Sequence, residues 1–235
     1  MQWLPWSGKL LSPWFMETSQ AEAMIENEQI LLSDVSFSYE DKKILEHVSA
    51  KINMNQTYVL KGANGIGKSS LFHLVTGLTE CQNGKITIGN ANSLSFSEKN
   101  FPEKLFYLPQ EDAQFDFSPN ELYQMILDTK MDLVYEIAKS FGLKDDLFFD
   151  SKISELSGGE RKKVFLSLAF ALNPQILLLD EPTNSLDESG KYRLNQLLKE
   201  RMGGALIITH ENCFDEIADH IYVLENGGLK CEEIR

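Results

Sequence analysis

Short apolar runs alternate with helical patterns along most of the chain, and this alternation predicts its elements. Two strand-like segments, 30–37 and 48–52, flank the charged turn Glu40-Asp41-Lys42-Lys43 and predict an antiparallel pair. The apolar run 57–60 predicts a short strand that leads directly into a glycine-rich loop. Apolar residues at helical spacing then predict a helix over 69–78. Strand, loop and helix therefore follow one another without a break.

A small helical insert is predicted in the middle of the chain. Strands are expected before it at 85–88, after the turn signal Asn83-Gly84, and at 105–108, before Pro109. Ser118 as an N-cap and Pro119 at the first helical position then predict a helix start, with apolar residues at helical spacing as far as about Gly142. The boundaries expected for the insert are about 111–155.

The remaining residues alternate as βα units do. The predicted order is helix 160–172, strand 175–180, helix 187–201, strand 205–209, a short helix near 213–218 and strand 220–224. The expected fold is α/β, with a mostly parallel sheet flanked by helices, an antiparallel β edge subdomain and a small α-helical subdomain.

Composition narrows the classes of function. A chain of 235 residues has room for one substantial core, and its formal charge of -13 argues against a general nucleic-acid binder, which needs clustered Lys and Arg. The basic run Arg161-Lys162-Lys163 is interpreted as a solvated helix face. Three cysteines without metal or disulfide spacing fit a reducing compartment. No apolar stretch approaches the length of a membrane span, which takes roughly 20 residues.

Residues 1–27 form a separate Trp-rich leader, since they hold Trp3, Trp6 and Trp14 between prolines and glycine. They lack the basic start and the apolar centre of a secretory signal peptide. Two interpretations stay open: the leader contacts a membrane interface or a partner, or it is a poorly ordered segment upstream of an alternative start at Met16 or Met24.

The strongest chemical signal is the loop Gly62-Ala63-Asn64-Gly65-Ile66-Gly67-Lys68-Ser69, which matches the G-x-x-x-x-G-K-[ST] phosphate-binding pattern between a strand and a helix. Its glycines allow backbone N–H groups to approach phosphate oxygens, and the following helix start favours negative charge. Lys68 is expected to hold the β and γ phosphates and Ser69 to ligate Mg²⁺. The residues expected to bind ATP here are Gly62, Asn64, Gly65, Gly67, Lys68, Ser69 and Ser70.

A second motif follows at Ile176-Leu177-Leu178-Leu179-Asp180-Glu181, where a buried strand ends in two acids. Parallel strands deliver such residues to the edge of the sheet at which ligands bind. Asp180 is expected to position Mg²⁺, largely through water, and Glu181 to act as a general base on the attacking water.

Between these two motifs lies Leu156-Ser157-Gly158-Gly159-Glu160, and with it the chain resembles the nucleotide-binding domain of the ATP-binding cassette (ABC) superfamily over about residues 28–230. The resemblance extends, in order, to an adenine-stacking aromatic, a Q-loop glutamine, a D-loop and a switch histidine. These match Tyr39, Gln110, Ser185-Leu186-Asp187 and His210.

The resemblance implies a role for each match. Tyr39 would stack on adenine, Gln110 would accept from Mg²⁺-bound water as a catalytic and metal-site residue, and His210 would contact the γ phosphate. Ser157, Gly158 and Gly159 would close over the ATP of an opposite subunit. Two chains, either two copies or two homologous cassettes, would therefore meet head to tail with ATP between them.

Two classes of function fit this resemblance. One is the ATP-hydrolysing subunit of a membrane transporter, peripheral on the cytoplasmic face through a separate transmembrane subunit, with export favoured over import. The other is a soluble ABC ATPase in a non-membrane task such as metallocluster assembly. The first is favoured, because the chain has neither the second cassette of a translation factor nor the zinc or coiled-coil insertions of a repair protein.

Overall fold

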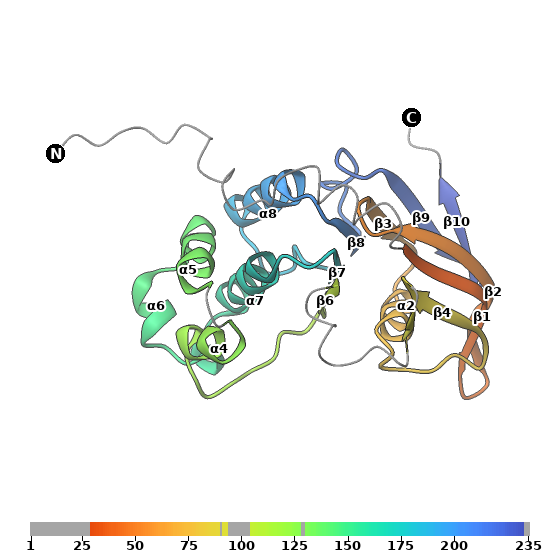
Figure 1. The fold of residues 1–235 in the computed structure, drawn as a ribbon, viewed down its shortest axis with the longest axis horizontal. Coiled ribbons are helices and arrows are strands. Elements are labelled where there is room, and N and C mark those ends of the chain that lie inside the picture. Colours follow the sequence, from red (N-terminus) through yellow and green to blue (C-terminus); the bar gives the residue numbers. More distant parts are fainter. Residues whose placement is uncertain (1–28, 90, 94–103, 128–129, 233–235) are drawn as a thin grey trace.

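The computed structural model describes residues 29–89, 91–93, 104–127 and 130–232. The Trp-rich leader predicted over 1–27 lies outside these residues. The described part forms a central parallel sheet with helices on one side and a second, antiparallel sheet on the other (Figure 1).

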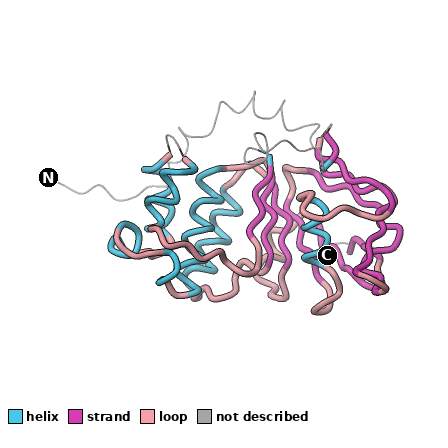
Figure 2. Tube along the Cα trace, turned by 90° about the horizontal axis from the view of Figure 1, so that it is seen from below, coloured by secondary structure: helices cyan, strands magenta, loops and turns pink. Residues whose placement is uncertain are grey.

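The central sheet has six strands in the order β10-β9-β3-β8-β7-β6, and Figure 2 shows them side by side through the middle of the molecule. Neighbouring strands are parallel from β9 to β6, and β10 pairs antiparallel with β9 at the edge. The strands are β3 (Thr57–Lys61), β6 (Leu105–Leu108), β7 (Ile176–Asp180), β8 (Gly204–Ile208), β9 (His220–Glu225) and β10 (Gly228–Glu232). The predicted mostly parallel sheet is confirmed.

The continuous apolar run in β7 reflects burial on both faces of the sheet. Leu177 and Leu179 pack into the core formed with the helices, whereas Ile176 and Leu178 pack into the core shared with the antiparallel sheet. Successive side chains of a strand point to opposite faces, so a strand covered on both sides has no solvent-facing position.

The second sheet has the strand order β2-β1-β4-β5. Its strands are β1 (Gln29–Tyr39), β2 (Lys42–Asn53), β4 (Asn83–Ile88) and β5 (Ala91–Asn92), and all of its pairings are antiparallel. The predicted antiparallel pair is present, but β2 begins at Lys42, because Glu40 takes a left-handed conformation (φ 49°) that closes a tighter turn than expected. Helix α2 (Lys68–Val75) packs with this sheet against the central one.

The other face of the central sheet carries the remaining helices. Helix α4 (Pro119–Ile126) begins at Ser118, whose hydroxyl accepts from the backbone N–H of Glu121, while the Glu121 carboxylate accepts from the N–H of Ser118. The chain continues through α5 (Met131–Ser140), α6 (Asp145–Phe149) and the short 3₁₀ turn η2 (Ile153–Glu155) to α7 (Gly158–Leu172). Helix α8 (Glu188–Glu200) follows β7.

Two sequence predictions were wrong in detail, and one strand was missed. The predicted helix near 213–218 is absent, because residues 213–217 form turns, and strand β10 was not predicted. Lys162 does not lie on a solvated helix face, because the residue is 1% exposed. Its partners come from a segment about fifty positions earlier in the chain, which local periodicity does not reveal.

No helix among the described residues is long and apolar enough to cross a membrane.

Candidate nucleotide-binding site

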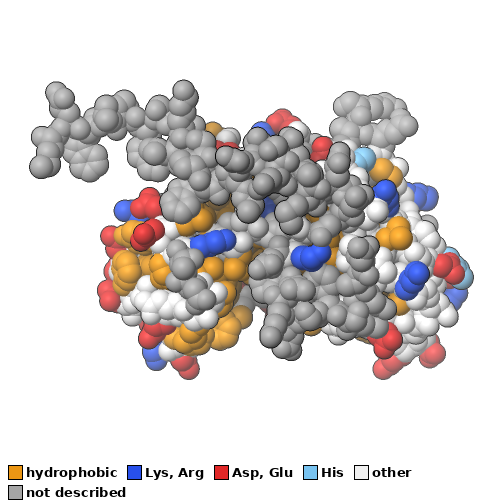
Figure 3. Space-filling view, in the orientation of Figure 1, with side chains coloured by type: hydrophobic (Ala, Val, Ile, Leu, Met, Phe, Trp, Pro, Cys, Tyr) orange, Lys and Arg blue, Asp and Glu red, His pale blue; other side chains and the backbone are white. Residues whose placement is uncertain are grey.

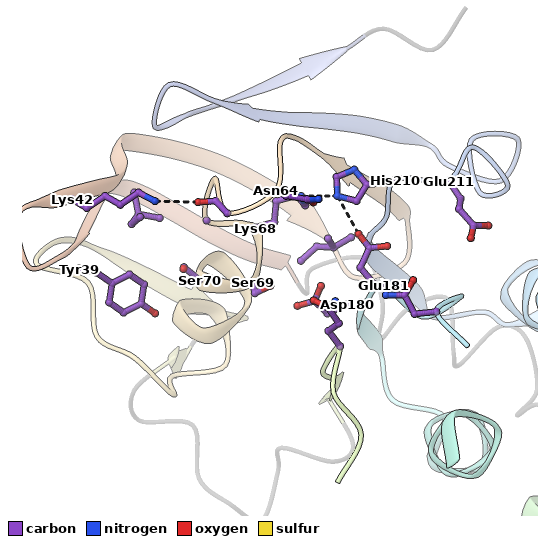
Figure 4. Close-up of a pocket in the computed structure, with 16 residues that line it drawn as sticks. Tyr39, Lys42, Asn64, Lys68, Ser69, Ser70, Asp180, Glu181, His210 and Glu211 are labelled. Carbon is purple, nitrogen blue, oxygen red and sulfur yellow. Dashed lines mark hydrogen bonds and ion pairs between the residues drawn. The ribbon is translucent and has the colours of Figure 1, made fainter. Parts of the chain in front are cut away.

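A cavity of about 570 Å³ lies at the carboxyl ends of the central strands, above the start of α2. Such an edge is where open α/β sheets bind ligands, because loops of several strands converge there. Figure 4 shows the side chains that surround the cavity. Its lining is Tyr39, Lys42, Ile44, Asn64, Gly65, Gly67, Lys68, Ser69, Ser70, Gln110, Asp180, Glu181, Asn184, Ile208, His210 and Glu211.

The glycine-rich loop needs its glycines for two different reasons. Gly65 (φ 70°) and Gly67 (φ 116°) both take backbone conformations that side chains disfavour. At Gly67 an added Cβ would also lie 2.2 Å from Cγ2 of Ile44, whereas nothing lies within 4 Å at Gly65. The loop is therefore held by backbone conformation at both positions and by packing at Gly67.

The first turn of α2 is built to receive an anion. Among the described residues, no side chain caps this helix, in contrast to α4, α7 and α8, which Ser118, Ser157 and Asp187 cap. The first N–H groups of a helix have no partner within the helix and carry partial positive charge. An uncapped start at a glycine-rich loop thus presents these N–H groups to a phosphate.

Lys68 lies at the centre of the site, 7% exposed. Its ammonium donates to the carbonyl oxygens of Gly62 at 2.8 Å and Ala63 at 3.1 Å, and lies 3.2 Å from Nε2 of His210. Burial lowers the pKa of Lys68, while the carboxylates of Glu181 and Asp180 oppose that shift. The site therefore holds one buried cation beside two acids.

The two acids at the end of β7 are buried, at 2% exposure for Asp180 and 8% for Glu181. Burial raises the pKa of Asp180, and a hydrogen bond from Ser69 and the charge of Lys68 oppose the rise. Burial likewise raises the pKa of Glu181, which the charge of His210 opposes. The left-handed backbone of Glu181 (φ 47°) ends the strand and turns this side chain toward the cavity (Figure 4).

His210 follows β8 and reaches the same edge, where its Nε2 lies 3.4 Å from Oε1 of Glu181. The next residue, Glu211, also lines the cavity and forms an ion pair of 3.0 Å with Lys191 on α8. The segment after β8 is thereby attached to α8, the helix that follows the D-loop.

The segment 156–160, called the signature from here on, lies outside the cavity. None of the described residues that line the cavity belongs to it. Ser157 is exposed and caps α7 through the N–H of Glu160, whose carboxylate accepts from the Ser157 hydroxyl at 2.6 Å. Gly159 packs against the D-loop so closely that an added Cβ would meet the carbonyl oxygen of Ser185 at 2.4 Å. The start of α7 therefore forms a separate surface beside the D-loop.

The structure brings together most of the predicted site residues and separates the rest. Tyr39, Asn64, Gly65, Gly67, Lys68, Ser69, Ser70, Gln110, Asp180, Glu181 and His210 line one cavity, whereas Gly62, Ser157, Gly158 and Gly159 do not. Gly62 supports the loop from below, where an added Cβ would lie 2.7 Å from the carbonyl oxygen of Leu224.

Sequence reasoning missed five residues that line the cavity: Lys42, Ile44, Asn184, Ile208 and Glu211. Lys42 lies three residues after Tyr39, and Glu211 directly follows His210, so proximity to a predicted residue was a usable signal for both. Lys42 reaches the loop, with its ammonium 3.4 Å from the carbonyl oxygen of Gly65. Ile44 offers no such signal, because an apolar residue in a strand resembles any core position.

The donor set fits a magnesium ion carried by a nucleotide. Among the described residues, no cluster of three or more His, Cys, Asp or Glu side chains could hold a metal ion unaided. Mg²⁺ is usually bound by one or two carboxylates together with substrate phosphates and water. The Ser69 hydroxyl and the Asp180 carboxylate, which both line the cavity, could supply the protein oxygens for such an ion.

Known proteins resemble this chain in sequence and in fold. A putative export ATP-binding/permease protein of Rickettsia bellii is 30% identical over 213 residues, which cover 85% of this chain and 37% of the relative. A putative ABC transporter ATP-binding protein of Clostridium tetani is 27% identical over 225 residues, covering 91% of this chain and 51% of the relative. The chain thus spans about half or less of the length of these curated relatives.

Two solved structures show the same fold. A bacterial Atm1-family ABC exporter with ATP bound superposes with a TM-score of 0.80 at 21% identity, over 89% of this chain and 40% of the other. The dimeric structure of MJ0796, a bacterial ABC transporter cassette, gives a TM-score of 0.78 at 23% identity, over 88% of this chain and 99% of the other. A profile of the ABC transporter family matches residues 45–184, more than half of the sequence, and the chain belongs to this family.

Proposed function

We propose that the chain binds ATP with Mg²⁺ and hydrolyses it to drive a transporter. One observation carries the ATPase proposal: an uncapped helix start, a buried lysine and two buried carboxylates converge on one cavity. This combination accommodates a triphosphate and provides a base for water. The family and the printed names of the relatives support the assignment.

Each side chain has a role that its position supports. The backbone of the glycine-rich loop and Lys68 bind the phosphates, and exposed Tyr39 offers its ring to the adenine. Glu181 accepts a proton from the attacking water, and His210 holds the Glu181 carboxylate in place. Gln110 lines the same cavity, where its side-chain oxygen would accept a hydrogen bond from water bound to the metal. When bound through Ser69 and Asp180, Mg²⁺ neutralises phosphate charge.

The exposed signature supports a head-to-tail pair of chains. Ser157 and the start of α7 form a second helix terminus that is exposed and does not line the chain's own cavity. A helix start carries partial positive charge, and the Ser157 hydroxyl that caps this one in the single chain could instead donate to an anion; a second copy or a homologous cassette would present such an anion in its bound ATP. The dimeric MJ0796 cassette, which shares the fold, supports this arrangement.

An apolar groove supports a membrane partner. The groove has a volume of about 330 Å³ and lies between the end of α2, β6, α4 and α7. Its lining is Thr76, Leu78, Leu105, Phe106, Tyr107, Ile126, Leu168 and Leu172. Figure 3 shows hydrophobic side chains gathered over the helical part of this view. A separate transmembrane subunit, on whose cytoplasmic face the cassette would sit, provides the apolar surface that such a groove requires.

Export is favoured over import, because several of the relatives are named export proteins. The competing function is that of a soluble ABC ATPase in a task such as metallocluster assembly. Isolation of the native complex separates the two: a multi-span membrane protein that co-purifies supports transport, whereas a complex recovered wholly from the soluble fraction contradicts it.

The test of the ATPase proposal is the Glu181→Gln variant. The amide keeps the shape of the side chain but accepts no proton, so hydrolysis should fall by about 10²-fold or more while ATP still binds. Size-exclusion chromatography should then show an ATP-dependent dimer. The control is Lys68→Ala, which should lose most ATP affinity by equilibrium binding. Unchanged steady-state hydrolysis in Glu181→Gln would remove Glu181 from the mechanism.

A further inference from the structure

Lys162 is a buried charge in the helix that begins at the signature. It lies on α7, one helical turn after Gly158, and its side chain is 2% exposed. A buried ammonium is costly unless oxygens surround it, and loss of one partner then leaves the other charge uncompensated. The position of Lys162 therefore depends on its partners.

Within the described part of the chain, the polar partners of the Lys162 ammonium all come from the segment that follows β6. The ammonium forms an ion pair with Oδ1 of Asp112 at 2.8 Å and donates to the carbonyl oxygens of Gln110 at 3.1 Å and Pro109 at 3.3 Å. Burial raises the pKa of Asp112, while the hydrogen bond and charge of Lys162 oppose the rise. Residues 109–112 are thus attached to α7 at three points.

These contacts connect two functional surfaces. At one end, the side chain of Gln110 lines the nucleotide cavity. At the other end, α7 begins with Ser157 and Gly158, which are exposed beside the D-loop. The next residue, Lys163, forms an ion pair of 3.3 Å with Asp187 of the D-loop. A displacement of the Gln110 backbone must therefore move Lys162 and α7 with it or break the buried hydrogen bond between them.

We propose that Lys162 is a positioning residue that ties residues 109–112 to the signature helix, so that ATP in the chain's own cavity sets the orientation of the signature offered to the partner. This inference rests on the proposed ATP-driven dimer. It assigns no contact with ATP to Lys162 itself. The bridge transmits the position of Gln110 through backbone carbonyls.

Two double variants, both made in the Glu181→Gln background, distinguish the effect of the polar contact between Lys162 and Asp112 from the effect of their charges. Lys162→Gln with Asp112→Asn removes both charges but keeps polar groups that can span the gap. Lys162→Met with Asp112→Leu keeps the apolar volume and removes the bridge. Both avoid an uncompensated buried charge. The measurements are monomer ATP affinity by equilibrium binding and the protein concentration for half-maximal ATP-dependent dimerisation by analytical ultracentrifugation.

We expect both double variants to bind ATP as monomers within about threefold of the Glu181→Gln chain, which is about 0.6 kcal/mol. The Met/Leu variant should need at least about tenfold more protein to dimerise, and the Gln/Asn variant should not. Dimerisation of the Met/Leu variant at the original concentration would overturn the inference, and so would an equal loss of ATP affinity. Failure of the Glu181→Gln chain itself to dimerise would instead overturn the proposed function, and the inference with it.

A measurement on the unaltered pair guards against misfolding of the variants. Hydrogen–deuterium exchange of the Glu181→Gln chain, at concentrations below dimerisation, should show that ATP changes amide protection in 109–112 and in the first turn of α7 together. A change confined to 109–112 would contradict the coupling. If the ion pair were purely structural, ATP would not change amide protection in α7.

Discussion

Single residues determine the chemistry of this site through burial and backbone conformation. The side chains of Lys68, Asp180 and Glu181 are buried at the carboxyl edge of the central sheet. Burial therefore disfavours the charged form of each group. Strain of this kind is concentrated at functional sites, where ligand binding compensates for it. The residue scale therefore predicts trade-offs between stability and function.

The glycines of the loop are not equivalent. Gly67→Ala should lower the free energy of unfolding of the nucleotide-free chain by about 3 kcal/mol, because unfavourable φ and contact with Ile44 add. Gly65→Ala should cost about 1 kcal/mol, because only backbone strain applies. Urea unfolding of the two variants checks the order. Equal costs would show that Ile44 moves aside freely.

The pH dependence of stability tests the burial of Glu181. Its folded pKa is raised above the ordinary 4.5, so its contribution to stability is full below that pH and is lost as pH rises through the folded value. Glu181→Gln removes this loss and should raise the melting temperature of the nucleotide-free chain at pH 7.5, and by less near pH 5.

Glu211→Gln is the matched control for that experiment. Glu211 lines the same cavity but is paired with Lys191, so its replacement breaks an ion pair and should give no gain in melting temperature at neutral pH. A pH-independent difference between wild type and Glu181→Gln would show that the Glu181 carboxylate is not desolvated by the fold.

At the scale of elements, two helices begin with the same chemistry but serve different surfaces. Helices α4 and α7 both start with a capping box, formed by Ser118 with Glu121 and by Ser157 with Glu160. The first is buried within the helical part of the molecule, and the second is exposed beside the D-loop. The two caps therefore differ in role. The cap at Ser118 stabilises the fold, whereas the cap at Ser157 also lies on an exposed surface with a proposed function.

Ser118→Ala and Ser157→Ala should each lower the free energy of unfolding by about 1 kcal/mol, the usual worth of an N-cap. Only Ser157→Ala should also reduce ATP-dependent dimerisation and steady-state hydrolysis, because in the proposed dimer only that helix start would contact the second chain. Denaturant unfolding and ATPase assays distinguish the two effects. An equal loss of ATPase activity in both variants would assign it to stability alone.

At the scale of the whole molecule, the two cores and the groove determine which surfaces remain for partners. Each face of the central sheet is buried, one under helices and one under the antiparallel sheet (Figures 1 and 2). The apolar groove remains open, with Leu78 69% exposed at its edge. An exposed apolar groove of this kind marks an interaction site.

Leu78→Glu should abolish co-purification with a membrane subunit, because the carboxylate would have to be desolvated in an apolar interface. ATPase activity of the isolated chain should stay within about twofold, since Leu78 does not line the nucleotide cavity. Tyr192→Glu is the control, because Tyr192 on α8 is 68% exposed and lies outside the groove. A membrane complex that survives Leu78→Glu would place the docking surface elsewhere.

The sequence by itself determined the family, the parallel sheet and the residues of the phosphate loop. This was possible because the eight residues of the loop, between a strand and a helix, include both the groups expected to bind phosphate and the glycines that the backbone conformation requires. The ends of β7 and β8 were predictable for a related reason: parallel strands bring their carboxyl ends to one edge.

Only the tertiary structure decided which side chains share a cavity and which charges are buried. Ile44 lines the nucleotide cavity through packing between distant segments. Lys162 is buried against the segment that follows β6, where Asp112 and two backbone carbonyl groups contact its ammonium. Helical periodicity shows which positions share a face, but whether that face meets water or an oxygen-lined gap depends on long-range packing.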